Sequence, residues 1–545
     1  MVEGIQRIVA RAVAAPGVTM VVSMVAAMLA TSPAIGAQSL DVGDPTGAYL
    51  RLLEVAGLAE RGFSPATSLS LTESRDALEG SAAHPWARHA DWLIGDEAPV
   101  GASARLRTFV NSSHPRVDND GAVWQGKGLT TALDARGDVR WRSVTLTLDP
   151  TLIYTGNASF DMAVVGLADM PAYAYPWRVI DLPQRFGPDA FWTLDGGQSE
   201  LAVDWKGARA SFGTRNLWWG PAARNPIVMS NNGPGFPHGS LATSGPLDIG
   251  IGALEGEWIW GRLGTSEYFD STVVDTDRFL TGIVLSYAPD FLDGLTLGLT
   301  RVFQQRAVDG VPFGDYLLVF QELFKRGLVS QNQPDGTDER DQMLSLFARW
   351  TLPESGFEAY VEWARTDHSL DLRDLALEPQ HSQGYTLGFQ KVVAESPRRL
   401  AALRGEVTHL ESSPTFQLRP RATYYEHSVV TQGYTHEGQL IGAGVGPGGN
   451  AQSLAFDLYA PWGSWGLDFE RRVIDNDAFW EWANATGASF DRHNVTLNFG
   501  AGAAYLIQPF EISASSALKR ELNRYFYDRD AWNVSFSLSA RWRAR

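Results

Sequence analysis

The sequence predicts an all-β fold: a transmembrane antiparallel β-barrel of about 18 strands, with a small helical bundle at its N-terminus. Three observations predict it. From about residue 101 to the end, apolar and polar residues alternate with the period of two that is typical of strands. Charged residues make up only 20% of the chain and aromatic residues 11%, including 19 Trp. The connections between the alternating segments are alternately short and long, as in barrels with short inner turns and long outer loops.

The overall composition limits the other possibilities. With 545 residues the chain could hold several domains, but one large barrel is also allowed. A mean hydropathy of -0.15 is too low for a bundle of membrane helices. A net charge of -17 argues against a nucleic-acid-binding groove, which needs a basic surface. Because cysteine is absent, disulfides contribute nothing, and any metal site would need His and carboxylate ligands.

Residues 1–37 are predicted to be a secretory signal peptide. Arg7 and Arg11 form its basic start, and an apolar run follows from Val18 to Ala30. Small residues then lead to an expected cleavage point between Ala37 and Gln38. An uncleaved membrane anchor is the alternative, but the run is shorter than the ~20 residues that a spanning helix needs.

Residues 38–100 are predicted to be helical and periplasmic. A first helix is indicated by apolar residues at helical spacing: Tyr49, Leu50, Leu52, Leu53 and Val55. Short second and third helices are expected to begin near Thr72 and Pro85, the latter an early position where helices tolerate proline. A mobile N-terminal linker is the alternative, but the regular spacing of large apolar residues favours a bundle.

Residues 101–545 are predicted to form the barrel, with long extracellular loops. In the last expected strand, six apolar residues share one face: Trp532, Val534, Phe536, Leu538, Ala540 and Trp542. Tight connections are expected at Ala288–Asp293, Pro353–Gly356 and Pro461–Gly463, and long ones at Val302–Asp341, Glu411–Gln452 and Ile474–Asp491. A soluble β-sandwich also alternates, but apolar faces that recur over many strands, together with alternating loop lengths, favour the barrel.

Two further features concern the lumen and its mouth. The carboxylates Glu358 and Glu362 lie on polar strand faces, where we expect them to pair with arginines such as Arg349 and Arg365. Within a long loop, Asp315–Arg326 is expected to form a short amphipathic helix. It could take part in binding, or it could cover the mouth of the barrel without binding anything.

One stretch, Ser211–Leu241, is too irregular for an ordinary strand or helix. Trp218 and Trp219 run directly into Gly220-Pro221, and an Asn pair precedes a segment rich in Gly and Pro. Prolines fix φ and remove backbone donors, while glycines adopt conformations that other residues avoid. Such a segment keeps one shape only when the surrounding structure supports it, so we expect a single feature held by the β-scaffold.

The residues Trp218–Pro221 and Ser230–Pro237 resemble the Wzi capsule-assembly family. The likeness extends from about Asp44 to the C-terminus, and the glycine-rich tract Gly442–Gly449 resembles that family's glycine-rich loop. The resemblance implies an outer-membrane β-barrel with a helical bundle at its inner end, about the same number of strands, and a role in holding surface polysaccharide on the cell.

The candidate polysaccharide-binding residues lie in this stretch and in one other long loop. Flat aromatic faces stack on sugar rings, while Asn amides and Arg forks donate directional hydrogen bonds to hydroxyls or acidic sugars. The candidates are Arg215, Trp218, Trp219, Arg224, Asn231, Asn232, Tyr434 and His436. The alternative is a structural motif whose tryptophans are wedged into the barrel. Counting strands back from the C-terminus puts the motif at the inner end, whereas the tight Lys206-Gly207 turn indicates the opposite orientation.

The sequence offers no candidate for catalysis, a metal or a cofactor. It contains no nucleophile elbow, zinc-binding helix or phosphate-binding loop. His427 and His436 are more simply interpreted as two loop residues than as a metal site, and no cofactor is expected.

We therefore expect a non-enzymatic, lectin-like barrel that binds capsular or exopolysaccharide and helps to assemble or attach it at the cell surface. It would lie in the outer membrane of a Gram-negative-type bacterium, in contact with outer-membrane lipid. The barrel-assembly machinery would insert it, because its aromatic last strand looks like the assembly signal of such proteins. A porin-type channel for small solutes is the alternative, and an outer-membrane enzyme is a third hypothesis that lacks a visible nucleophile and base.

Overall fold

The computed structural model describes residues 40–79, 84–94, 100–167, 170–269, 277–307, 310–321, 340–366, 372–413, 423–486 and 491–543. The predicted signal peptide, residues 1–37, lies outside the described residues.

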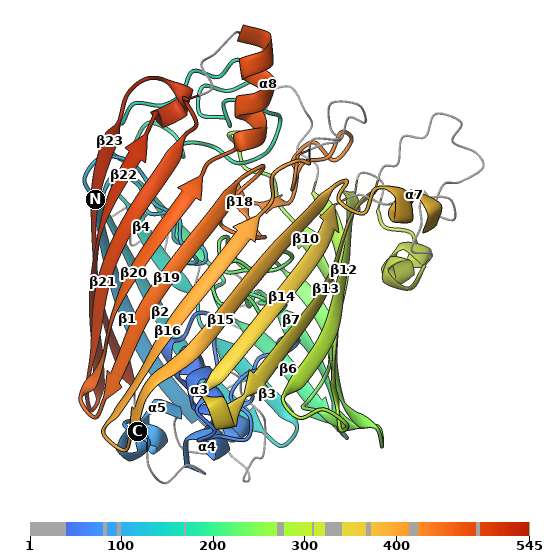
Figure 1. Cartoon of the computed structure of the whole chain (residues 1–545), viewed down its shortest axis with the longest axis vertical. Helices are drawn as coiled ribbons and strands as arrows, with labels where there is room; N and C mark the ends of the chain where they lie inside the picture. Colours follow the sequence, from blue (N-terminus) through green and yellow to red (C-terminus); the bar gives the residue numbers. More distant parts are fainter. Residues whose placement is uncertain are drawn as a thin grey trace, which may run out of the picture.

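The N-terminal helices lie at one end of the barrel, the lower end in Figure 1. They are α3 (Pro45–Val55), α4 (Leu71–Glu79), η1 (Ala87–His89) and α5 (Ala90–Ile94). Helix α3 begins where the Asp44 carboxylate accepts the backbone N–H of Thr46 at 2.8 Å, with proline at the first helical position. The buried Tyr49 ring lies 4.8 Å from that of Tyr459 on the barrel wall, and the Trp86 indole donates to the carbonyl of Ala460 at 3.1 Å. The predicted helical bundle is thus confirmed, and it is fixed to the barrel wall.

Long antiparallel strands form the wall. Their bounds are β1 (Val100–Asn111), β2 (Gly128–Trp141), β3 (Val144–Leu148), β4 (Thr151–Thr155), β5 (Phe191–Asp195), β6 (Glu200–Trp205), β7 (Ala208–Gly213), β8 (His238–Thr243), β9 (Leu247–Asp248), β10 (Gly252–Leu263), β11 (Arg278–Pro289), β12 (Leu295–Arg306), β13 (Arg340–Leu352), β14 (Phe357–Thr366), β15 (Gln383–Ser396), β16 (Arg399–His409), β19 (Asn450–Ala460), β20 (Gly463–Val473), β21 (Val495–Ile507), β22 (Phe510–Leu522) and β23 (Ala531–Arg543). A two-stranded hairpin, β17 (Thr435–His436) with β18 (Gln439–Leu440), lies outside this sheet.

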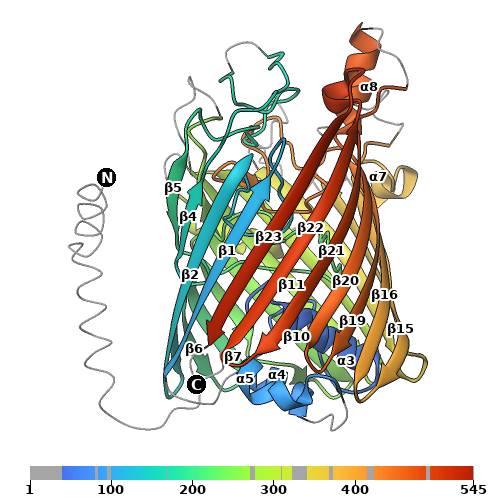
Figure 2. The same ribbon diagram turned by 90° about the vertical axis from the view of Figure 1, so that its left-hand side faces the viewer.

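The barrel has 18 strands, as predicted, within the part of the chain that the structure describes. Three of them are interrupted: β3 and β4 both pair with β2, β5 and β6 continue one another beside them, and β8 and β9 both pair with β10. The first strand, β1, pairs with the last, β23, and closes the wall, as Figure 2 shows. Closure leaves no edge of the described wall unpaired, which a β-structure needs in order to span a membrane.

Connection lengths distinguish the two ends of the barrel. Short turns, such as that at Ala288–Asp293, lie at the end that carries the helices, which we call the turn end. Long connections, such as the one between β16 and β19, start and end at the other, the loop end, where α7 (Leu372–Leu377) and α8 (Asn476–Thr486) also lie. This is the arrangement of a transmembrane barrel.

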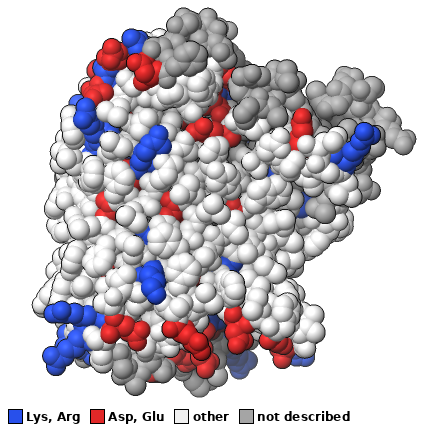
Figure 3. Space-filling model, viewed as in Figure 1, with Lys and Arg blue, Asp and Glu red and all other residues white. Residues whose placement is uncertain are grey.

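The outward face of the wall is apolar. On β23, Trp532 and Phe536 are 53% and 49% exposed, whereas Asn533 and Ser535 between them face inward and are buried. On the face drawn in Figure 3, the charged side chains gather toward the two ends, and a mostly uncharged zone separates them. None of the described helices is both long and apolar enough to cross a membrane.

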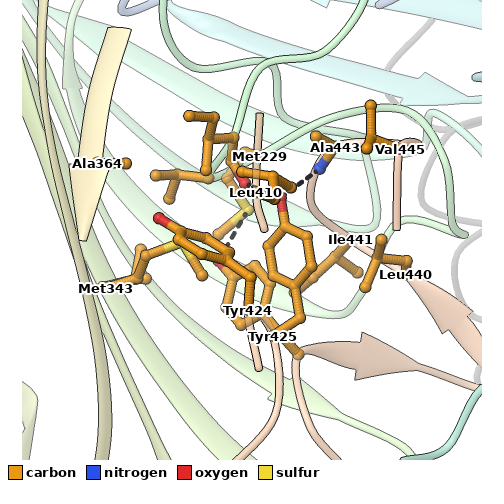
Figure 4. Packing of buried hydrophobic residues seen from close by; sticks show 14 of the residues in the cluster. Met229, Met343, Ala364, Leu410, Tyr424, Tyr425, Leu440, Ile441, Ala443 and Val445 are labelled. Carbon is orange, nitrogen blue, oxygen red and sulfur yellow. Dashed lines mark hydrogen bonds between the residues drawn. The ribbon is translucent and has the colours of Figure 1, made fainter. Parts of the chain in front are cut away.

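The middle of the lumen is filled. The connection 214–237 between β7 and β8 folds inward and packs against residues from 423–449, which also fold inward. Figure 4 shows this core, in which Met229 from the first segment meets Tyr425 and Ile441 from the second. The strand β7 leaves the Lys206-Gly207 turn at the turn end, so the irregular stretch enters the lumen from the side of the loops.

Two predictions about the lumen and the loops are only partly right. Glu358 does pair with Arg349, at 2.8 Å, but Glu362 accepts the backbone N–H of Ile227 at 3.1 Å. The amphipathic helix starts earlier than expected: Phe313–Phe320 forms the 3₁₀ helix η2, and residues 322–326 lie outside the described residues. Proline at 312 lies immediately before η2, where its fixed φ suits the start of a helix.

Candidate functional site

Arg215 and Trp219 hold the irregular stretch to the barrel wall. The Arg215 guanidinium donates to Glu200 at 2.6 Å and also pairs with Glu257. Trp219 is 1% exposed, and its indole N–H points at Glu257, 3.4 Å away. A Cβ on the wall residue Gly282 would lie 3.1 Å from the indole ring. The absence of a side chain at this position therefore leaves room for the ring. Neither side chain lies at a surface.

Arg224 and the Asn pair join the irregular stretch to two loops. Arg224 forms ion pairs with Asp118 in the β1–β2 loop and with Glu470 on β20. The Asn232 amide donates to the carbonyl of Gly442 at 2.9 Å, and its oxygen accepts the backbone N–H of Asn119 at 3.1 Å. The amide of Asn231 donates to the carbonyl of Asn119 at 2.8 Å. These side chains therefore tie the irregular stretch to two loops and to strand β20 inside the lumen.

Tyr434 and His436 lie on the segment that fills the lumen. The Tyr434 ring stacks on that of Tyr425, with 5.9 Å between centroids and 14° between planes. His436 is 4% exposed, and its Nδ1 accepts the backbone N–H of Gly264 at 2.9 Å. Nδ1 of His427 instead accepts a hydrogen bond from the backbone N–H of Val430. Among the described residues, no three His, Asp or Glu side chains are grouped to hold a metal ion.

Trp218 differs from its neighbour Trp219 because its ring is only half buried. It lines a cavity of about 270 Å³ near the turn end, between α3 and the inner wall, together with Phe63 and Tyr459. Its indole N–H donates to the carbonyl of Ala222 at 3.1 Å, which leaves the ring rather than the N–H to face the cavity. Direct sugar binding by the eight predicted residues stays a prediction.

A second cavity, of about 280 Å³, lies below the loop end, and we call it the loop-end cavity. Five connections between strands contribute to it, together with Asn232 from the irregular stretch. Its aromatic lining is Trp124, Phe160, Tyr175, Trp177 and Tyr525. Its volume is close to the lower end of the ~300–1,000 Å³ typical of small-molecule sites, which are mostly apolar with a few placed polar groups.

The polar groups of the loop-end cavity are partly unpaired. The side-chain oxygens of Gln439 and Asn494 are buried and accept no hydrogen bond within the described ranges. The Arg524 guanidinium lies over the Tyr525 ring, 4.6 Å from its centroid, and 3.2 Å from Nδ1 of His114. Burial, with the nearby charges of Lys519 and Arg524, lowers the pKa of His114 to about 2, so the imidazole is neutral. The cavity thus offers aromatic faces beside both donors and acceptors.

An acidic cluster fixes the wall of this cavity. The hydroxyl of Tyr175 donates to Asp475 at 2.6 Å, and Arg178 lies 3.5 Å from both Asp475 and Glu426. Burial raises the pKa of Tyr175 well above its ordinary value, and the adjacent Asp475 adds to this effect. Burial is also the main reason that the pKa of Glu426 rises to about 8. The cluster joins the β4–β5 loop to the connection that precedes α8.

Sequence reasoning missed the aromatic lining of the loop-end cavity. Trp177 and Tyr525 lie in loops far apart in sequence, and the signal that could have found them is the density of aromatic residues at 173–177 and 525–527. Asn232 is the one predicted residue that lines this cavity.

Comparison with known proteins places the chain in a family. Residues 99–457 match the family described as capsule assembly protein Wzi. The fold is similar to that of the Escherichia coli outer-membrane protein Wzi, described as a carbohydrate-binding β-barrel involved in group 1 capsule assembly. The TM-score is 0.62 at 12% identity, over 93% of this chain and 99% of that one. The Pseudomonas aeruginosa outer-membrane protein OprD matches with a TM-score of 0.41 at 11% identity, over 82% of this chain and 94% of that one. A search of curated proteins found no match. Because the family match spans well over half of the sequence, the chain belongs to the Wzi capsule assembly protein family.

Proposed function

We propose that this protein is a non-enzymatic outer-membrane barrel that binds surface polysaccharide and helps to assemble or attach it at the cell surface. The observation that carries the proposal is the loop-end cavity, where aromatic rings and unpaired side-chain oxygens lie together above a filled lumen. Family membership and the description of the E. coli relative support the same function.

The mechanism is lectin-like. The faces of Trp177 and Tyr525 suit contact with the C–H faces of a sugar ring, while Gln439 and Asn494 accept hydrogen bonds from its hydroxyls. A cavity of this size holds only a short part of a polymer, so one site binds weakly. Many sites on neighbouring barrels that hold one chain would raise the overall affinity by multivalency.

The proposed location follows from the same arrangement. Export through the predicted signal peptide would bring the chain to the periplasm, where the barrel-assembly machinery inserts it into the outer membrane. The turn end with its helices then faces the periplasm, and the loop end faces outward, where the polysaccharide is. The apolar outward wall contacts outer-membrane lipid.

The filled lumen favours this function over a porin-type channel. Residues 214–237 and residues from 423–449 form a packed core across the middle of the barrel, whereas a porin keeps a water-filled path.

A pull-down of purified capsular polysaccharide by the detergent-folded protein tests the proposal. We expect the wild type to bind, and a Trp177→Ala/Tyr525→Ala variant to lose most of the binding while it still migrates as a folded barrel. Trp192→Ala, which removes an outward-facing tryptophan that is 65% exposed, is the matched control and should bind normally. Normal binding by the cavity variant would exclude the loop-end cavity, and no binding by the wild type would contradict the function.

A further inference from the structure

The 3₁₀ helix η2 packs against the outside of the barrel. Its buried residues Leu318 and Val319 contact Ile283 on β11 and Phe303 on β12. On β11 the neighbouring Gly282 faces inward, toward Trp219, so Ile283 must face outward. Figure 1 shows this short helix outside the wall beside β12 and β13, toward the loop end. It therefore lies on the side of the wall that faces lipid, and not in the mouth of the barrel.

The polar groups between η2 and the wall have partners. Arg301, an outward-facing arginine that is 3% exposed, donates to the carbonyls of Val319 at 3.1 Å and Gln321 at 2.6 Å, at the end of the helix. The Asp315 carboxylate, near the start of the helix, accepts from Gln305 at 2.6 Å and Arg340 at 2.8 Å. Helix ends and charges without partners are strongly disfavoured in hydrocarbon. The carbonyls at the C-terminal end of η2 and the Asp315 carboxylate near its start thus have protein partners and do not need water.

The other side of η2 is apolar and exposed. Phe313 is 82% exposed, Phe320 60% and Leu317 40%. Next to them on the wall, the rings of Trp258 and Trp260 lie 4.2 Å apart, and Phe320 lies 5.0 Å from Trp258. Aromatic residues of this kind gather at the interface between a bilayer and water. The exposed side of η2 is therefore continuous with the lipid-facing surface of the barrel.

We propose that η2 is an interfacial anchor, whose Phe313, Leu317 and Phe320 side chains bind among the lipid acyl chains of the leaflet at the loop end. This sector of the wall, β10 to β13, then carries an apolar rim that fixes the height of the barrel in the bilayer. The occupant is lipid rather than a second copy of the chain, because η2 continues the lipid-facing wall and presents apolar side chains that suit lipid acyl chains, while the C-terminal carbonyls and the Asp315 carboxylate bond to the wall.

Spin labels can test this cleanly because the chain has no cysteine. Phe313→Cys carries the test label. Leu346→Cys, at an outward-facing position in the middle of β13, is the control in lipid, and Val164→Cys, 75% exposed in the β4–β5 loop, is the control in water. Each labelled full-length barrel is reconstituted in dimyristoylphosphatidylcholine nanodiscs. Relaxation by oxygen, which partitions into lipid, is then compared with relaxation by a water-soluble nickel chelate.

We expect the label at 313 to resemble the one at 346, with an oxygen-to-nickel accessibility ratio severalfold higher than that at 164. A ratio equal to that at 164 would place η2 in water and overturn the proposal. Shielding from both reagents, with dipolar coupling between labels on two copies in vesicles, would identify a second chain as the occupant and also overturn it. A Leu317→Cys label provides an independent reading, should the Phe313→Cys variant fold poorly.

Discussion

Replacing Trp219 with alanine separates a structural role of the irregular stretch from direct sugar binding. The indole is 1% exposed, packs in the lumen core and lies against Gly282, a wall position without a side chain. Loss of such a buried tryptophan leaves a cavity that the β-barrel cannot close, for which about 3–5 kcal/mol of unfolding free energy is expected. The hydrogen bond to Glu257, at 3.4 Å, is long and adds little, and Glu257 keeps its ion pair with Arg215.

The assay is urea unfolding in phosphatidylcholine vesicles, followed by the gel mobility of folded and unfolded barrel, with polysaccharide binding measured on the folded fraction. We expect Trp219→Ala to lower the unfolding midpoint strongly, and to leave binding per folded molecule near that of the wild type. Trp192→Ala should lower the midpoint much less, because its side chain faces lipid and its removal leaves no internal cavity. A Trp219→Ala barrel that is as stable as the wild type but no longer binds would refute the reasoning and make Trp219 a ligand contact.

Three further predictions follow from particular contacts. Gly444→Ala should lower the unfolding free energy by about 1–3 kcal/mol in the same urea titration, because its Cβ would lie 2.7 Å from the Asn232 side-chain oxygen; Gly446→Ala, where nothing lies within 4 Å but φ is +85°, should show only the backbone strain. The pKa of Glu426 is raised from 4.5 to about 8 by burial, so the folded state binds the extra proton between these values and the urea midpoint should fall as pH rises through this range. Glu426→Gln should remove that part of the pH dependence, and an unchanged slope would contradict the assignment. In planar bilayers the wild type should conduct little because its lumen is filled, and porin-like conductance would contradict the packed core.

Much of the fold could be predicted from the sequence because it depends on short-range patterns. Alternation with a period of two sets which side of a strand faces lipid, as the exposed Trp532 and Phe536 beside the buried Asn533 show. The helical spacing of Tyr49, Leu50 and Leu53 predicted a buried helix face, and these residues are buried. Turn and loop lengths, read along the chain, predicted which connections lie at the same end.

The candidate site was less predictable because its parts come together only through long-range contacts. The unusual composition at Trp218-Trp219 and Asn231-Asn232 indicated a special segment, but it could not show whether these side chains meet a ligand or one another. In the folded chain Asn232 bonds with Gly442 and Asn119, which are more than 100 residues away. The aromatic residues of the loop-end cavity come from three loops that are far apart in the sequence, and no local pattern shows that these loops meet.

The sequence by itself therefore determined the barrel, an approximate number of strands and the N-terminal helices, because the residues of each strand show which of its two faces is apolar. Only the tertiary structure decided that Trp219 is buried while the half-buried Trp218 faces a cavity near the turn end, that the lumen is filled, and that η2 lies outside the wall. The physical reason is that burial inside a closed barrel depends on which distant segments fold into the lumen, and periodicity along one strand contains no information about them.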